Sequence, residues 1–308
     1  MRISLVIPTH DRPAGLAAAV ESALAGDRKP DELIVVHDGP GGEPDLAGAL
    51  RGAGVGYRYI RGDRPSLPRS RNLGIDAASG DVIVFGEDDL AFPPEYFARV
   101  EALYAADAEE QVGGIGAVIR EPGPRRLPRR AWELLARWLG EGSWRPRQGV
   151  SRYVELPAAL AGRLVPASRL SGGGLTLRRE AAAERFDESF SGYALGEDME
   201  FCFRAGRRHA LFRAPELTAL HDPAPTGRPD ARARGRMYAA NLLHIARRST
   251  DGGAGTWLLA AYQLAGMSAL YATWSLLSLR GYNARFAAGV VGELWRRGLR
   301  EARTLACG

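Results

Sequence analysis

The chain has 308 residues, of which 45% are hydrophobic and 25% are charged, enough for one large domain or two with a proper core. Its two cysteines, Cys202 and Cys307, lie far apart, which argues against a disulfide framework and a zinc site and favours a reducing compartment. The net charge of +5 comes from arginine, because Lys29 is the one lysine, and we attribute it to codon bias rather than to nucleic-acid binding.

The positive charge is concentrated near the end of the chain. From Arg228 onward there are twelve arginines and four acidic residues, a net charge of +8, which leaves −3 on the remainder. A basic tail on a slightly acidic body favours an anionic partner, such as a membrane surface or an acceptor phosphate, over a nucleic acid. The apolar run at Met1–Pro8 is too short for a signal peptide, so we expect a cytoplasmic protein, with the inner face of the membrane as an alternative location.

In the first 220 residues, short apolar runs alternate with segments of helical periodicity. This alternation predicts an α/β fold with a doubly wound, mostly parallel, Rossmann-like sheet. Residues 122–147, rich in Pro, Arg and Trp, predict an irregular insertion over the site, with a short helix at 132–139. The predicted strands are 3–7, 33–36, 57–60, 82–85, 112–119, 175–177 and 210–212, and the predicted helices are 13–24, 46–50, 67–78, 94–106, 179–185 and one that opens at Gly196.

From Pro229 the pattern becomes helical, so we expect a domain over 1–228 and a helical region over 229–308. Residues 256–279 carry no charge, and 282–305 alternate apolar residues with arginine. The first segment is long enough to span a bilayer, but Gln263 and several small or polar residues lower its hydropathy. We therefore expect a helical hairpin that packs on the body, lies in a membrane interface or forms a homodimer contact.

Three carboxylates follow the strand at 82–85 directly: Glu87, Asp88 and Asp89. Adjacent acids repel one another, and their burial is costly unless something neutralises them. At the carboxyl end of a parallel strand they lie where open α/β sheets bind ligands. A hard divalent cation, Mg²⁺ or Mn²⁺, is the simplest neutraliser and also binds phosphate oxygens, whereas a solvated acidic turn is the alternative.

Three further motifs precede the acidic run in a fixed order. The first strand ends in Pro8-Thr-His-Asp-Arg12, the second ends in His37-Asp38-Gly39, and the helix before the acidic strand contains Pro68-Arg-Ser-Arg-Asn-Leu-Gly-Ile75. In this order, over roughly residues 1–225, the motifs resemble the family 2 inverting glycosyltransferases with the GT-A fold. The resemblance implies a nucleotide-sugar site built at the strand ends.

The resemblance also implies roles for single residues. Thr9, with Pro8 before it, and Arg12 would lie beside the base and phosphates. Asp38 would accept a hydrogen bond from the N3–H of uracil or thymine, although an Asp before a glycine is also a common turn former. Arg71 would approach the diphosphate, and Asn72 would brace a loop.

In the acidic run, the family's Asp-x-Asp element falls on residues 87–89. Asp89 would then be a metal ligand and Asp88 would face the ribose or the metal, while Glu87 departs from the usual Asp and its role stays open. His221 would complete the metal shell, although a lone histidine is more often structural. Gly173, in Ser171-Gly-Gly-Gly174, would line the donor sugar.

The segment Gly192–Glu200 resembles the family's second signature, an acidic pair at a helix start. Asp198 would be the general base that takes the proton of the acceptor hydroxyl, and Glu197 would orient the acceptor or Asp198. Acidic residues also favour helix N-termini for structural reasons.

We therefore interpret the chain as a metal-dependent inverting glycosyltransferase. It would move a sugar from a UDP- or dTDP-sugar to an acceptor hydroxyl on a glycan, a lipid-linked sugar or a small molecule. One alternative is a sugar-nucleotide pyrophosphorylase, whose glycine-rich loop is missing at residues 8–15. The other is a degenerate domain that only binds membranes or partners.

Overall fold

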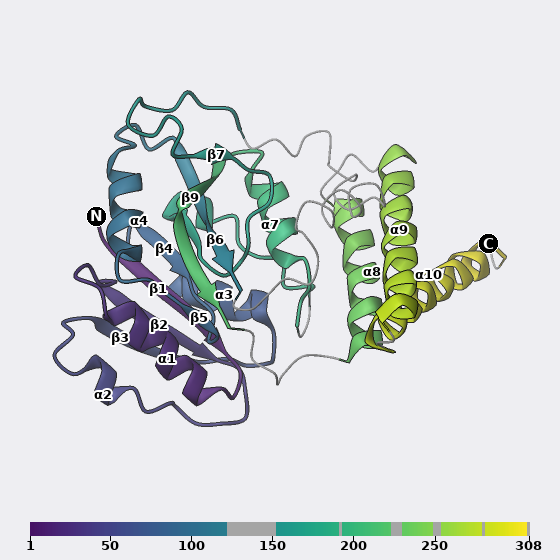
Figure 1. Ribbon diagram of the computed structural model, residues 1–308, viewed down its shortest axis with the longest axis horizontal. Helices are drawn as coiled ribbons and strands as arrows, with labels where there is room; N and C mark the ends of the chain where they lie inside the picture. Colours follow the sequence, from purple (N-terminus) through teal and green to yellow (C-terminus); the bar gives the residue numbers. More distant parts are fainter. Residues whose placement is uncertain (122–151, 191–192, 223–229, 249–253, 279–280, 307–308) are drawn as a thin grey trace. The chain divides into compact units, whose positions relative to one another are not determined.

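Four parallel strands form one half of the sheet, in the order β3-β2-β1-β4. Every residue of β1, β2 and β4 is buried, as expected for apolar strands covered on both faces, whereas β3 lies at the edge and is largely exposed. This computed structural model describes all residues except 122–151, 191–192, 223–229, 249–253, 279–280 and 307–308 (Figure 1). The strands are β1 (Ile3–Thr9), β2 (Glu32–His37), β3 (Gly56–Arg61) and β4 (Val82–Phe85).

The other half of the sheet is mixed. β8 (Leu175–Arg178) runs antiparallel between β4 and β6 (Val112–Arg120), and β6 pairs in parallel with β9 (Ala210–His221). Two short strands, β5 (Leu90–Ala91) and β7 (Val165–Pro166), pair antiparallel with β9. The full order is β3-β2-β1-β4-β8-β6-β9-β5, with β7 beside β9.

Helices cover both faces of this sheet, which confirms the predicted doubly wound α/β fold (Figure 1). In β1, Ile3, Leu5 and Ile7 join one core and Val6 joins the other, as the two-residue period of a strand requires. The first core includes α1 (Pro13–Leu24) and α4 (Tyr96–Ala105) and is flanked by the short α2 (Ala47–Leu50). The second includes α3 (Leu67–Ala77), α6 (Arg179–Ala182) and α7 (Glu197–Ala205).

The largest difference from the sequence-based prediction concerns β9. The strand was expected only over 210–212, but it continues to His221 through a register shift beside Gly116 and Val118. Pro215 and the irregular register interrupt the apolar pattern, so the second half of the strand lacks a clear sequence signal. The insertion at 122–147 and its helix at 132–139 lie outside the described residues.

Contacts divide the chain into two compact units. One is drawn from Met1–Gly123, Gly149–Tyr193 and Glu197–Gly227, and it contains the sheet. The other contains α8 (Ala231–Arg248), α9 (Ala254–Ser278) and α10 (Gly281–Ala306). The predicted boundary at 228–229 lies outside the described residues and stays a prediction.

Within the helical unit, α8 and α10 approach closely at two glycines. A Cβ atom on Gly235 would lie 2.0 Å from the carbonyl oxygen of Phe286, and one on Gly289 would lie 2.1 Å from that of Arg232. α9 packs through Leu264 and neighbouring residues, and the amide of its Gln263 donates to the hydroxyl of Tyr238 on α8 at 2.8 Å. In the part of the chain that the structure describes, no helix combines the length and apolar character needed to cross a bilayer.

Candidate functional site

The strand register brings the predicted site residues of β1, β2 and β4 to one edge of the sheet. Thr9 pairs with His37 and Val6 pairs with Phe85. The polar residues that follow the three strands therefore lie at similar positions along the strand direction. This is the carboxyl edge of the parallel strands, where α/β sheets of this kind bind ligands.

Asp88 is almost fully buried and connects the acidic turn to β1 and to the start of α1 through hydrogen bonds. One of its oxygens accepts a hydrogen bond from Thr9 Oγ1 at 2.8 Å, and the other lies 2.9 Å from Arg12 Nη1. The start of α1 closes against the same turn, because a Cβ atom on Gly15 would lie 2.5 Å from the carbonyl oxygen of Asp88. The carboxylate of Asp88 thus joins β1 and α1 to the acidic turn, and the same Arg12 Nη1 lies 3.5 Å from an oxygen of Asp89. The expectation that Asp88 faces the ribose or the metal stays a prediction.

Glu87, Asp89 and His221 form a group that can hold a metal ion. Each offers one ligand atom, and these atoms lie within 4.8 Å of one another. The pairing of β5 with β9 creates the group, because it places Leu90 opposite His221 and brings Nε2 of the histidine to 3.3 Å from Asp89. The hydrogen bond with Asp89 and the charge of this carboxylate raise the pKa of His221.

The donor set fits a divalent cation. Two carboxylates supply the oxygen ligands that Mg²⁺ and Mn²⁺ prefer, and the imidazole adds a nitrogen ligand that Mn²⁺ tolerates more readily than Mg²⁺. Burial and the neighbouring Asp89 raise the pKa of Glu87, although Arg71 lowers it. Arg71 therefore does not fully neutralise this carboxylate, and a cation can do so. Asp89 and His221 were the predicted metal residues, and the structure adds Glu87, whose role the sequence left open.

Asp38 lies at the end of β2 with both oxygens engaged. One oxygen accepts from the backbone N–H of Ser66 at 2.9 Å and from Ser70 Oγ at 3.0 Å. The other lies 2.7 Å from Nδ1 of His10, whose side chain is half exposed. The first two bonds fix the carboxylate on the N-terminus of α3, while the contact with the exposed His10 is the one that a ligand can replace.

The helix α3 carries Arg71 and Asn72 into the interior. The Asn72 amide donates to the carbonyl oxygen of Phe186 and to Glu188, and its oxygen accepts from the Phe186 backbone, so it holds the loop at 186–188 against α3. Arg71 is completely buried, and its guanidinium donates to Glu197 at 2.8 Å and to Glu87 at 3.1 Å. The expected contact between Arg71 and a diphosphate stays a prediction.

Glu197 and Asp198 begin α7, beside the glycine-rich loop at 171–174. Asp198 accepts hydrogen bonds from the backbone N–H of Gly172 at 3.2 Å and of Met199 at 2.7 Å. Burial and the adjacent Asp198 raise the pKa of Glu197 to about 8, against the effect of Arg71. A Cβ atom on Gly173 would lie 3.0 Å from the carboxylate carbon of Glu87, so this loop runs directly past the metal group.

Sequence reasoning missed the partners that hold the site residues. Ser66 caps α3 and Ser70 follows one turn later, and together they fix Asp38. A serine before Leu-Pro at a helix start is a recognisable cap, but its bond to Asp38 depends on tertiary structure. No sequence signal identified His10 as the partner of Asp38.

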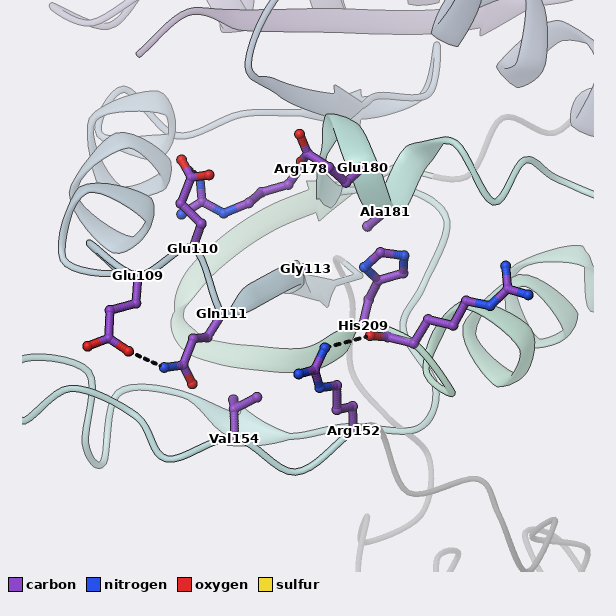
Figure 2. A pocket seen from close by; sticks show the side chains of 11 residues that line it. Glu109, Glu110, Gln111, Gly113, Arg152, Val154, Arg178, Glu180, Ala181 and His209 are labelled. Carbon is purple, nitrogen blue, oxygen red and sulfur yellow. Dashed lines mark hydrogen bonds and ion pairs between the residues drawn. The ribbon is translucent and has the colours of Figure 1, made fainter.

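A pocket of about 350 Å³ lies elsewhere in the same unit (Figure 2). Gly113 near the start of β6 and Arg178 at the end of the antiparallel β8 line it, so it lies at the opposite edge of the sheet. Arg178 is already bound to Asp107 and to backbone carbonyls, and none of the predicted site residues lines the pocket. We therefore place the candidate site at the carboxyl edge and not here.

Comparisons with known proteins agree with this geometry. The profile described as glycosyl transferase family 2 matches residues 4–159, half of the chain. A search of curated proteins found no match.

Solved structures with the same fold include three glycosyltransferases of low sequence identity. The mannosyltransferase PcManGT from Pyrobaculum calidifontis, in complex with GDP-Man and Mn²⁺, has a TM-score of 0.56 and 16% identity, covering 96% of this chain and 87% of its own. Glucosyl-3-phosphoglycerate synthase from Mycobacterium tuberculosis, in complex with Mn²⁺, UDP-Glc and phosphoglyceric acid, has a TM-score of 0.50 and 21% identity, covering 79% of each chain. TarS from S. aureus has a TM-score of 0.52 and 14% identity over 89% of this chain, which spans only 44% of TarS.

Proposed function

The chain belongs to glycosyl transferase family 2, and from that premise we propose that it is a metal-dependent inverting enzyme that uses a nucleoside diphosphate sugar. The observation that carries the proposal is the convergence of Glu87, Asp89 and His221 at the sheet edge that also holds Asp38 and Asp198. A degenerate binding domain has no need to keep this set together.

The metal group supports a divalent cation, Mg²⁺ or Mn²⁺, held by Glu87, Asp89 and His221. When bound, such an ion would neutralise the charge of the diphosphate leaving group. The solved complexes of PcManGT and of glucosyl-3-phosphoglycerate synthase contain Mn²⁺ with a nucleotide sugar, which agrees with this proposal.

We assign the proton transfer to Asp198. The acceptor hydroxyl oxygen attacks the anomeric carbon of the donor sugar. On the opposite face, the bond between this carbon and the diphosphate oxygen breaks, and the nucleoside diphosphate leaves. The hydroxyl proton passes to a carboxylate oxygen of Asp198. The backbone N–H groups of Gly172 and Met199 hold this carboxylate in a fixed direction, and each of its oxygens keeps a lone pair for the acceptor.

We propose that Asp38 recognises the base. Its oxygen at His10 can accept from the N3–H of uracil or thymine once the histidine moves away, which favours UDP- or dTDP-sugars. The N1–H of guanine is a donor of the same kind, so GDP is the main competing outcome. The acceptor class, a glycan, a lipid-linked sugar or a small molecule, stays open.

A thermal-shift screen of UDP, dTDP, GDP and ADP, each with and without Mn²⁺, tests this proposal. A ligand that binds only the folded protein raises its melting temperature. We expect a rise for UDP or dTDP that requires Mn²⁺ and is lost with EDTA. If no nucleotide raises the melting temperature, the binding-only domain is favoured. If a separate assay shows pyrophosphate released from a nucleoside triphosphate and a sugar 1-phosphate, the pyrophosphorylase is favoured.

We further propose that α10 meets an anionic membrane surface. Its exposed face carries Ala284, Ala288, Val291 and Trp295 at helical spacing, and Trp295 is 70% exposed. The exposed arginines Arg285 and Arg296 lie beside this stripe. An apolar stripe with an aromatic residue and basic neighbours suits the boundary between headgroups and acyl chains. A homodimer through the same face is the alternative.

A further inference from the structure

We propose that Arg71 is a positioning residue that fixes the metal group and the catalytic carboxylates relative to each other, and that Gly172 keeps the space it needs. The inference rests on the proposed function, because it concerns residues of the same site. It gives Arg71 a role that requires no contact with substrate.

Arg71 joins the two sides of the site through one guanidinium. Nη1 lies 2.8 Å from Oε1 of Glu197, the neighbour of the candidate base, and Nη2 lies 3.1 Å from Oε1 of Glu87 in the metal group. The guanidinium also lies over the ring of Phe186, with Cζ 5.1 Å from the ring centroid. The side chain is 0% exposed, so packing, stacking and two ion pairs together allow it a single position.

Gly172 contacts this guanidinium from the glycine-rich loop. A Cβ atom at position 172 would lie 2.3 Å from Nη2 and 2.7 Å from both Cζ and Nη1 of Arg71. The backbone conformation of Gly172 is accessible to any residue, because its φ angle lies outside the left-handed region that favours glycine. The absence of a side chain therefore serves the close approach of Arg71 and not a special backbone shape.

The same glycine also holds the candidate base, since its backbone N–H donates to Asp198 at 3.2 Å. Arg71 thus touches Glu87, Glu197 and the residue that orients Asp198. A displacement of the guanidinium would move the metal group and the base together. Lysine replaces Arg71 poorly, because its ammonium is a single point charge and lacks the planar fork whose two Nη atoms reach separate carboxylates.

The experiment compares Arg71→Lys and Gly172→Ala with wild type. Calorimetric titration in the presence of Mn²⁺ uses UDP, dTDP and GDP in turn, and steady-state kinetics use the sugar donor of the nucleotide that binds. We expect Arg71→Lys to weaken the Mn²⁺-dependent nucleotide affinity and to lower kcat, each by roughly 10- to 100-fold, as is usual for residues behind metal ligands. Gly172→Ala should change both quantities in the same direction without any change of charge. Gly48→Ala is the control, because a Cβ atom at position 48 meets nothing within 4 Å.

The two quantities separate positioning from a general effect on stability. A residue that only stabilises the fold would lower the melting temperature while the affinity and kcat per folded molecule stay at wild-type values. Wild-type affinity and kcat in folded Gly172→Ala would overturn the proposal, even where Arg71→Lys does not fold. Failure of the proposed function itself appears in the wild-type titration, as an absence of Mn²⁺-dependent binding for every nucleotide tried.

Discussion

The carboxylate of Asp198 accepts a hydrogen bond from the backbone N–H of Gly172 at 3.2 Å, although the two residues belong to different elements. One residue begins α7 and the other lies in the glycine-rich loop before β8. This bond and the one from Met199 fix both oxygens of the side chain before any substrate arrives. A general base that is oriented in advance needs no rearrangement during the reaction.

Asp198→Asn should therefore lower kcat by roughly two to four orders of magnitude, because an amide cannot take up the acceptor proton. Donor affinity should hardly change, since the amide oxygen can still accept one of the two backbone bonds. Steady-state kinetics together with calorimetric donor binding test this, with the exposed Glu109→Gln as control. An equal loss of donor binding would assign Asp198 to the binding site instead.

Asp38→Asn should weaken nucleotide affinity by roughly tenfold to a hundredfold, the value of a hydrogen bond to a charged group. The asparagine oxygen can keep the bonds from Ser66 and Ser70, and its NH₂ group then faces the base, donor against donor. Calorimetry with the nucleotide selected by the thermal-shift screen measures the loss. An unchanged affinity would mean that the base binds away from β2.

Glu32 should contribute to acid stability, far from the site. Burial raises its pKa, but hydrogen bonds from Ser4 and from both the backbone and the hydroxyl of Ser79 outweigh burial and lower it. Because the pKa of Glu32 is lower in the folded protein than the 4.5 of the unfolded chain, the ionised carboxylate stabilises the fold above about pH 4.5. This stabilisation is lost as the pH falls through the pKa of the folded state. Glu32→Gln should therefore melt at a lower temperature at neutral pH and lose less on acidification than wild type, whereas the exposed Glu21→Gln should follow wild type. If the melting temperatures of Glu32→Gln and wild type fall in parallel as the pH is lowered, this prediction is wrong.

If α10 binds an anionic membrane, the protein should sediment with vesicles that contain phosphatidylglycerol and not with vesicles of pure phosphatidylcholine. Each basic residue near an anionic surface contributes about 1 kcal/mol, so high salt should weaken binding without abolishing it. Trp295→Ser should reduce the bound fraction, while Tyr153→Ser, at an 87% exposed aromatic residue of the sheet unit, should not. A protein that ignores both vesicles and elutes as a dimer would make this face an interface between copies.

Much of the fold could be predicted from the sequence, because its strands are short apolar runs bounded by turns. The buried parallel strands β1, β2 and β4 contain such runs. β5 and the second half of β9 could not be predicted, since a two-residue strand and a strand interrupted by a register shift lack periodicity.

The site residues followed from motif order, but their orientations did not. Glu87, Asp88 and Asp89 are adjacent in sequence, and only the fold shows that Asp88 bonds to Thr9 and Arg12 while Glu87 and Asp89 meet His221. The burial of Arg71 between two carboxylates likewise depends on α7, which lies far along the chain.

Calorimetric titration of the nucleotide selected by the thermal-shift screen into wild type and Asp89→Asn, with and without Mn²⁺, tests the proposed metal site. Asp89 is the metal-group residue that also positions His221, so its loss removes one ligand and misplaces another. We predict Mn²⁺-dependent binding for wild type and for Asp222→Asn, a neighbouring exposed carboxylate, and none for Asp89→Asn at equal thermal stability. Nucleotide binding by Asp89→Asn with the wild-type dependence on Mn²⁺ would contradict the metal site and the mechanism built on it.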